Sequence, residues 1–269
     1  MLKLFHFLAY SFAILAFLCV VQAQETDFMS DIENVPRRKS PGIFHRPAKN
    51  CPSNQLEYAN CLLAEGRTRK AMKQYSDLVH EWNDSPEAPV AQQKYAVLLE
   101  NSRRYLRAFD EFQYLIDNYA GRFPYEKAMN HQFHIANYLM TAKRYRFFIF
   151  PGFSAPERAL SLFEQILKNG FSECHRLPPQ FYIGLIHEEM KKYKEAIEAY
   201  RIIQSRYHGS SAFAAEARFR QAYCLYIIAN ASPRDVASCR RALSALAMYI
   251  RDYPDNQNIN ITQRYRSEE

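Results

Sequence analysis

Glycine is scarce in this sequence, with seven among 269 residues, and none of them forms a phosphate-binding loop or a Gly-x-Ser-x-Gly motif. No two cysteines have Cys-x-x-Cys spacing, so the sequence predicts no structural zinc site. The alternation of β-branched and polar residues that is typical of strands is also missing. These absences exclude, at the level of motifs, the common nucleotide-binding enzymes, α/β-hydrolases and zinc modules.

Other catalytic look-alikes are incomplete. His187 and Glu188 begin a zincin-like pattern, but position 191 holds lysine where the second histidine is required. His131 and His134 lie three residues apart, and no third ligand is evident near them, so a metal-dependent enzyme is a minor alternative. We expect a protein without catalytic activity, metal or cofactor.

The composition predicts a folded helical protein. Hydrophobic residues make up 48% and aromatic residues 14% of the chain, which is enough for a core. Apolar residues recur three and four positions apart, as in residues 108–116, which is the helical period. The net charge of +7 is modest and spread along the chain, so we expect no nucleic-acid partner. Binding to an anionic membrane surface is kept as an alternative.

The predicted helices come in pairs that repeat along the chain. Each pair has a small residue in its first helix, a small residue in its second, and a large residue, usually aromatic, four positions later; such hairpins bury their apolar faces by stacking. We expect an all-α fold, a right-handed superhelix (an α-solenoid) of about five such helical hairpins. The five sets are Ala59/Ala71/Tyr75, Ala96/Ala108/Phe112, Ala136/Ala159/Phe163, Gly184/Ala196/Tyr200 and Ala222/Ala242/Leu246.

The chain ends differ in composition from the repeats. Residues 1–23 resemble a secretory signal peptide, with an uncleaved membrane anchor as the alternative. Leu18 stands before Cys19, where a lipoprotein signal needs a small residue, so lipidation is not favoured. Export from the cytoplasm follows as an expectation. The predicted parts are the signal peptide 1–23, a flexible basic leader 24–52, the repeat domain 53–255 with insertions near 142–155 and 229–236, and a polar tail 256–269.

Two local features complete the expected fold. Pro178 and Pro179 are expected to open the first helix of the fourth hairpin, where a missing N–H costs little. Five cysteines follow the signal peptide, an odd number, and we expect most of them to be small buried packing residues. If one disulfide forms, Cys224–Cys239 is the candidate, because the two lie on the helices of the last hairpin.

The hairpins also resemble a known family. Gly184, His187, Tyr193, Ala196 and Tyr200 stand at tetratricopeptide signature positions. Residues 55–255 are similar to the BamD family of the outer-membrane β-barrel assembly machinery. Three stretches carry the similarity, namely 66–75 with 85–91, 105–112 with 115–119, and 146–153 with 156–163. That resemblance implies a periplasmic scaffold that binds a barrel-assembly subunit and outer-membrane precursor peptides. The alternative is a general envelope scaffold for cell-wall synthesis or polysaccharide export.

Stacked hairpins expose a concave groove lined by their first helices. The lining positions are expected three residues before the small residue, and one, four and five after it. Amides there can pair with an extended peptide backbone, and aromatics can hold its apolar side chains; burial of the aromatics in the core between repeats is the other interpretation. The predicted groove residues are Asn60, Leu63, Gln93, Val97, Glu100, Asn101, Phe133, Asn137, Met140, Phe181, Leu185, Glu188, Phe219, Tyr223 and Tyr226.

A cluster of aromatic residues interrupts the third hairpin. Pro151 and Gly152 predict a turn within it. The cluster either folds back as a cap on the joint between repeats, which we favour slightly, or projects as a docking surface. Its phenylalanines are Phe147, Phe148, Phe150 and Phe153.

Overall fold

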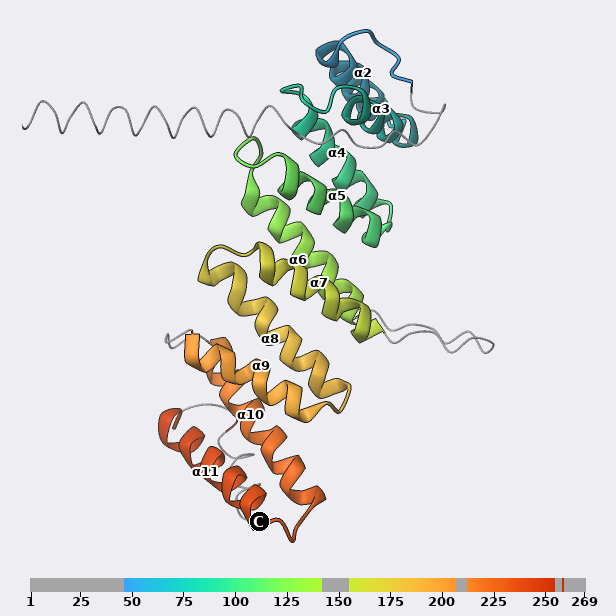
Figure 1. The fold of residues 1–269 in the computed structure, drawn as a ribbon. Helices are drawn as coiled ribbons and strands as arrows, with labels where there is room; N and C mark the ends of the chain where they lie inside the picture. The colour runs from blue at the N-terminus through green and yellow to red at the C-terminus, as the bar shows by residue number, and fades with distance from the viewer. Residues whose placement is uncertain (1–45, 142–154, 207–211, 255–257, 259–269) are drawn as a thin grey trace, which may run out of the picture. The chain divides into compact units, whose positions relative to one another are not determined.

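The computed structural model describes residues 46–141, 155–206, 212–254 and 258. This part of the chain holds ten helices and no strand, and the helices follow one another as hairpins (Figure 1). The all-α fold and the five-hairpin repeat are therefore confirmed. The pairs are α2 (Pro52–Ala64) with α3 (Thr68–Glu81), α4 (Ala88–Asn101) with α5 (Tyr105–Asn118), α6 (Tyr125–Thr141) with α7 (Ala155–Asn169), α8 (Glu173–Glu189) with α9 (Tyr193–Arg206), and α10 (Ala212–Ala231) with α11 (Val236–Asp252).

Several expectations fall outside the described residues. The signal peptide 1–23, nearly all of the leader 24–52, and the tail beyond residue 258 are among them. So are the four phenylalanines of the third-hairpin insertion, Phe147, Phe148, Phe150 and Phe153. These stay predictions. Within the described ranges, no helix combines the length and the apolar character needed to cross a membrane.

The chain divides into two compact units between Ala128 and Met129, within α6. In unit 1, which ends at Ala128, α3 packs against both α2 and α4, and α5 packs against α4. In unit 2, which begins at Met129, α8 packs against α7 and α9, and α10 contacts α8, α9 and α11. Successive hairpins within each unit thus share an interface, as a repeat fold requires.

The repeated small and large residues form the core of every hairpin. All the alanines and large residues of the five sets are buried, with at most 1% of their surface exposed. Gly184 shows why a small residue is needed, because a Cβ atom there would lie 2.4 Å from Cε1 of Tyr200. The predicted positions are therefore where helices approach closely and a large side chain fills the remaining space.

Three of the hairpins turn in the same way. Gly66, Arg103 and Lys191 each lie seven residues after the small residue of the first helix, and each has a positive φ between 58° and 74°. The next residue donates its backbone N–H to the carbonyl five positions back, at 2.8–2.9 Å. This left-handed turn satisfies carbonyls at the helix end, and it is tight enough for the antiparallel return.

Buried glutamines tie the two helices of a hairpin together, which the sequence analysis missed. Gln55, Gln92 and Gln180 each donate Nε2 to a backbone carbonyl of the second helix, at 2.8–3.1 Å, always 19 residues later in the chain. Gln132 is buried at the same position in the third hairpin, and its Oε1 accepts a hydrogen bond from Asn169. The signal was present, because glutamine stands four residues before the small residue in four of the five hairpins.

Two expectations about helix ends were wrong. α8 begins at Glu173, so Pro178 and Pro179 lie inside it. The backbone N–H groups of His175 and Arg176 both donate to Ser172, and the prolines remove only hydrogen bonds to carbonyls of the first turn. No separate insertion spans 229–236 either. α10 continues to Ala231 and α11 starts at Val236, so the extra residues mostly lengthen the two helices of the last hairpin.

The expectations about cysteine were also wrong in part. Cys51, Cys61, Cys174, Cys224 and Cys239 are all free thiols, so Cys224 and Cys239 form no disulfide. Cys224 alone is buried, whereas Cys61 and Cys174 are exposed. The helical period explains this difference: Cys224 faces the neighbouring hairpin in the cluster around Tyr200, but the exposed pair lie on outward-facing positions of their helices.

Candidate functional site

A pocket of about 360 Å³ opens in unit 2. Side chains from four helices, α6, α8, α9 and α10, meet around it. Four of the predicted groove residues come together here, namely Met140, Leu185, Glu188 and Tyr223. The complete lining is Met140, Leu185, Glu188, Glu189, Tyr193, Arg220 and Tyr223.

The inner wall of the pocket carries a connected polar network. The Tyr200 hydroxyl donates to Oε2 of Glu188 at 2.9 Å, and Arg220 forms an ion pair with Oε1 of the same carboxylate at 3.0 Å. Arg220 also pairs with Glu216 one turn earlier on α10, at 2.9 Å. Asn258 donates to the other oxygen of Glu216, at 2.9 Å. Glu188 is thus fixed by α9 and α10, and Arg220 is held by two carboxylates.

Burial sets the protonation of the groups behind this wall. It raises the pKa of the Tyr200 hydroxyl far above its ordinary value, and the neighbouring Glu188 carboxylate raises it further. Burial, again with Glu188, raises the pKa of the Cys224 thiol to about 12. Both groups are therefore protonated at neutral pH, so Tyr200 serves as a hydrogen-bond donor and Cys224 is not a nucleophile.

Unit 1 contains a similar polar network. The Tyr75 hydroxyl donates to Oδ1 of Asn60 at 2.7 Å, and Lys94 donates to the same oxygen at 2.6 Å. Lys94 also lies over the Tyr75 ring, 5.9 Å from its centroid. In both networks the tyrosine belongs to one repeat and the basic residue to the next repeat. The basic residue lies two positions before the small residue of its own first helix. The same position in the fourth repeat is Tyr182, which stacks on Phe163 at 5.2 Å.

The remaining predicted groove residues of unit 2 are mostly used in packing. Phe133 contacts Phe163 and Tyr182, and Phe219 contacts Tyr249, with ring centroids 5.5–5.8 Å apart. Phe181 and Tyr226 are 7% and 8% exposed. Phe133, Phe181 and Phe219, which lie three residues before the small residue, therefore face other helices. This agrees with the second interpretation, in which the aromatics pack between repeats. Asn137 is half-buried and does not line the pocket.

In unit 1 the predicted groove residues vary more in exposure. Asn60, Leu63, Gln93 and Val97 are half-buried, Asn101 is exposed, and Glu100 is only 8% exposed. The Asn60 side-chain oxygen is already occupied by Tyr75 and Lys94. Ligand binding by these residues stays a prediction.

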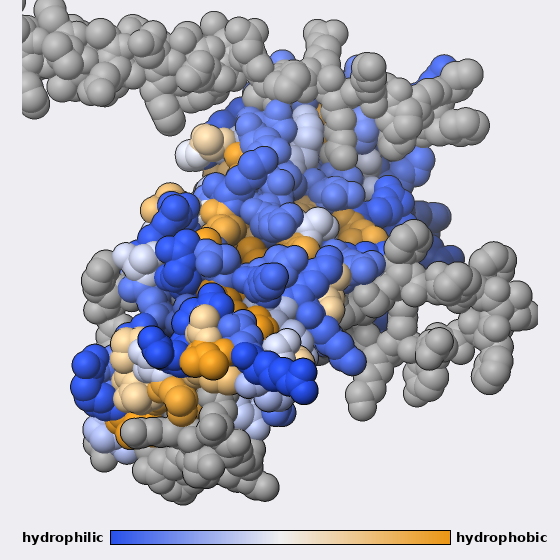
Figure 2. Space-filling view, turned by 60° about the horizontal axis from the view of Figure 1, so that its bottom comes forward, coloured by the Kyte–Doolittle hydropathy of each residue, from blue (hydrophilic) through white to orange (hydrophobic). Residues whose placement is uncertain are grey.

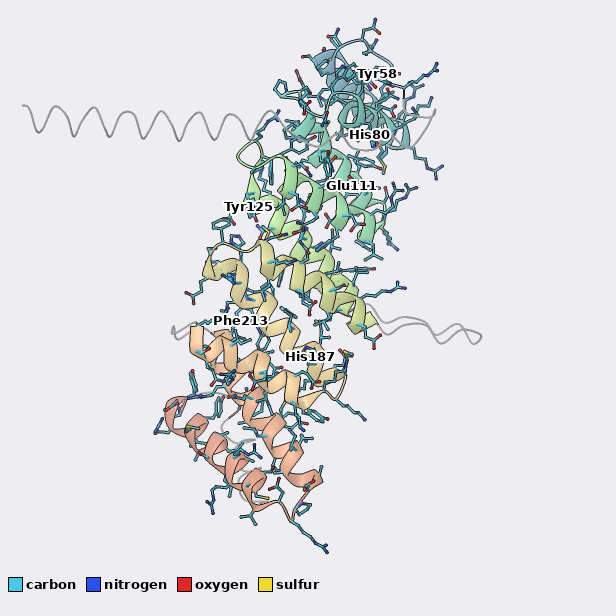
Figure 3. All side chains as sticks on the ribbon, viewed as in Figure 1. Tyr58, His80, Glu111, Tyr125, His187 and Phe213 are labelled. Carbon is cyan, nitrogen blue, oxygen red and sulfur yellow. The ribbon has the colours of Figure 1, made fainter. Side chains whose placement is uncertain are left out.

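The histidines do not form a metal site with other ligands in the described residues. No group of three or more histidine, cysteine, aspartate or glutamate side chains is gathered in that part of the chain. His187, labelled in Figure 3, lies on α8 next to Glu188 and is half-buried; burial lowers its pKa, so the imidazole is neutral at pH 7. The face seen in Figure 2 is mostly hydrophilic, with several hydrophobic areas between the hydrophilic ones.

Comparisons with known proteins agree with this architecture. Residues 180–210, which cover most of α8 and all of α9, match the family model of the tetratricopeptide repeat. This stretch of the chain is similar to a tetratricopeptide repeat. The comparison with curated proteins gives no significant match.

One solved tetratricopeptide-repeat protein has a similar fold, and two others align less closely. A tetratricopeptide-repeat protein from Bacteroides fragilis is 13% identical, with a TM-score of 0.53 over 82% of this chain and 100% of its own. A second, from Parabacteroides merdae, is 12% identical with a TM-score of 0.39, over 81% of this chain and 71% of its own. A third, from Thermus thermophilus, is 16% identical with a TM-score of 0.39, over 81% of this chain and 98% of its own.

Proposed function

We propose that this protein is a non-enzymatic scaffold that binds a protein partner through the pocket of unit 2. The observation that carries the proposal is the convergence of Met140, Leu185, Glu188 and Tyr223 on one pocket. Tetratricopeptide folds typically use their inner helices to hold extended peptides, so this is the face on which a partner is expected.

The physical character of the pocket suits a peptide side chain. Leu185 and Met140 offer apolar surface, and Tyr193 and Tyr223 offer aromatic rings with a polar end. Glu188 and Arg220 are fixed before any ligand arrives, which lowers the ordering cost of binding. The volume of about 360 Å³ matches the lower end of ligand pockets and exceeds that of one side chain.

We further propose that the scaffold works in outer-membrane β-barrel assembly, exported to the periplasm and peripheral to the outer membrane. The resemblance of residues 55–255 to the BamD family supports this role, as does the signal-peptide pattern of residues 1–23. Its partners would be a barrel-assembly subunit and precursor peptides. The alternative is an envelope scaffold for cell-wall synthesis or polysaccharide export, which the same fold and the weak lipidation signal at Cys19 would suit.

Site-specific photo-crosslinking in cells tests both levels of the proposal. Benzoylphenylalanine replaces Tyr193, which lines the pocket, and the captured proteins are identified by mass spectrometry. The matched control is the same replacement of Tyr138, an exposed tyrosine of α6 outside the pocket lining. We expect capture from position 193 and little from position 138.

The identity of the captured protein separates the two roles. A barrel-assembly subunit or an outer-membrane precursor supports the assembly role. Cell-wall or polysaccharide-export proteins replace it with the alternative and keep the pocket as the binding site. Equal capture from positions 193 and 138, or capture from 138 alone, overturns the pocket as the partner site.

A further inference from the structure

Resting on the proposed function, we infer that the pocket of unit 2 accepts a basic side chain of the partner, with arginine fitting best. The inference depends on three properties of the lining: which charges are already paired, which charge is free, and what the walls are made of.

The cation of the pocket is not available to a ligand. Arg220 pairs with Glu188 at 3.0 Å and with Glu216 at 2.9 Å. An incoming carboxylate would have to displace one of these partners and would then face the other at close range. The pocket therefore disfavours acidic side chains and the terminal carboxylate of a peptide, although it contains an arginine.

One carboxylate of the lining is available. Glu189 is exposed at the end of α8, and it forms no hydrogen bond or ion pair with any residue that the structure describes. Glu188 and Glu189 place two carboxylates in the lining against one guanidinium, although the whole chain carries a net charge of +7. Lys192 and Lys194 flank Tyr193 in sequence but do not line the pocket. The local charge thus favours a cation.

The walls suit the stem of a long basic side chain. Leu185 and Met140 can pack against its methylene groups, as apolar surfaces do with arginine and lysine stems. Tyr193 and Tyr223 present rings on which a guanidinium can stack. A planar guanidinium can also donate two hydrogen bonds to the Glu189 carboxylate, which a lysine ammonium does less well. Arginine satisfies all three parts of the lining together.

Methyl NMR on the full chain, labelled with ¹³C-methyl methionine, tests the inference with defined probes. Met140 reports from inside the pocket and Met248, on α11, reports from outside it; the Met140 signal is assigned with Met140→Leu. The probes are N-acetyl-arginine amide, its uncharged isostere N-acetyl-citrulline amide, and N-acetyl-norleucine amide. We expect the arginine compound to shift the Met140 signal saturably and to leave Met248 unchanged.

Charge removal supplies the second arm. Glu189→Gln should weaken binding of the arginine compound by about fivefold, as expected for an exposed ion pair, and should bring it close to the citrulline compound. The matched control is Glu173→Gln, which removes an exposed carboxylate from the other end of the same helix. That variant should bind the arginine compound as the unaltered protein does.

The possible results are distinct. Stronger binding of the norleucine or citrulline compound overturns the inference and assigns the pocket to an apolar or neutral side chain. Equal weakening by the two glutamine variants, or no shift of Met140 by the arginine compound, also overturns it. The crosslinking yield from position 193 is measured separately, so a partner captured there without arginine binding would retain the proposed function and reject this inference.

Discussion

The contact between Gly184 and Tyr200 brings α8 and α9 closer together than an alanine at position 184 would allow. A Cβ atom there would lie 2.4 Å from one ring carbon and 2.8 Å from two others. The ring cannot move aside easily, because Tyr200 is fully buried and its hydroxyl is held by Glu188. In the first hairpin the same position is Ala59 opposite Tyr75, so the fourth hairpin depends more strongly on glycine.

Gly184→Ala should therefore destabilise the protein by about 1–3 kcal/mol, because overpacking outweighs the better helix propensity of alanine. The measurement is urea unfolding followed by circular dichroism. Ala59→Gly, which removes a methyl group at the equivalent position, serves as the control and should cost less than overpacking does. An unchanged urea midpoint for Gly184→Ala would contradict the close approach of the two helices.

Single residues also show how far the sequence could predict the site. The small and large residues of each hairpin were predictable because they recur at fixed spacing and only small residues fit there. Phe181 and Phe219 were assigned to the groove, but Phe181 is buried in the core and the half-buried Phe219 packs against Tyr249. The helical period shows which residues share a face and not which neighbour that face meets. Glu189 has no counterpart at the same position of the other repeats, and only the packing of α8 against α10 brings it to one pocket with Arg220.

At the level of elements, the helical hairpins differ in the residue that makes their turn. Gly66 occupies the left-handed conformation at φ 74°, whereas Arg103 and Lys191 adopt it at φ 58° with a Cβ atom. A side chain in this region costs about 1–2 kcal/mol per residue relative to right-handed geometry, and glycine avoids most of that cost. Two of the three turns thus carry conformational strain.

Lys191→Gly should stabilise the protein by about 0.5–1 kcal/mol, because the relief of strain exceeds the added flexibility of the unfolded chain. Gly66→Ala should have the opposite effect by a similar amount, although a Cβ atom at position 66 would meet no atom within 4 Å. Urea unfolding of both variants measures the difference. Destabilisation by Lys191→Gly would show that interactions of the lysine side chain stabilise the fold by more than its backbone strain costs.

The start of α11 depends on a carboxylate cap. Asp235 accepts hydrogen bonds from the backbone N–H groups of Ala237 and Ser238, at 3.1 and 3.2 Å, and from the Ser238 hydroxyl at 2.5 Å. The Ser238 hydroxyl first, and then these backbone groups, hold the pKa of Asp235 below its ordinary value. The folded state therefore prefers the ionised form of this residue.

A lowered pKa gives stability that is present above the unfolded-state value and is lost as pH falls through the folded-state value. Asp235→Asn keeps an acceptor for the cap but does not titrate. We expect the unaltered protein to be more stable than this variant at pH 7, and the difference between them to shrink below about pH 4. Urea unfolding at about pH 7 and about pH 3 brackets the ordinary pKa of aspartate and measures the difference. A difference that stays constant over this range would exclude the proposed role of the Asp235 charge.

At the scale of the whole molecule, the repeat is local in sequence and its contacts are between neighbours. This is why the order of helices was predictable from the sequence, while the ends of some helices were not. The extra residues of the last hairpin extend α10 and α11, and these two helices pack against each other. The buried glutamines also make contacts that are local in sequence, since each one joins two helices of a single hairpin.

The division at Ala128 predicts how far a local defect spreads. In a fold of neighbouring repeats, stability is set by each hairpin and its interfaces, so opening can be confined to part of the chain. Gly184→Ala loosens the contact between α8 and α9, which lies wholly within unit 2. Hydrogen exchange followed by mass spectrometry should show faster exchange in peptides from α8 to α11, and unchanged exchange in peptides from α2 to α5.

The same prediction can be tested with a destabilising substitution in unit 1. Ala59→Val adds two methyl groups at a fully buried position of unit 1. It should speed exchange in α2 to α5 and leave α8 to α11 unchanged. If either substitution speeds exchange equally in both sets of helices, the chain opens as one cooperative body. In that case a partner bound at the pocket would also stabilise α2 to α5, which lie outside its own unit, because binding to the folded state stabilises every part that unfolds with it.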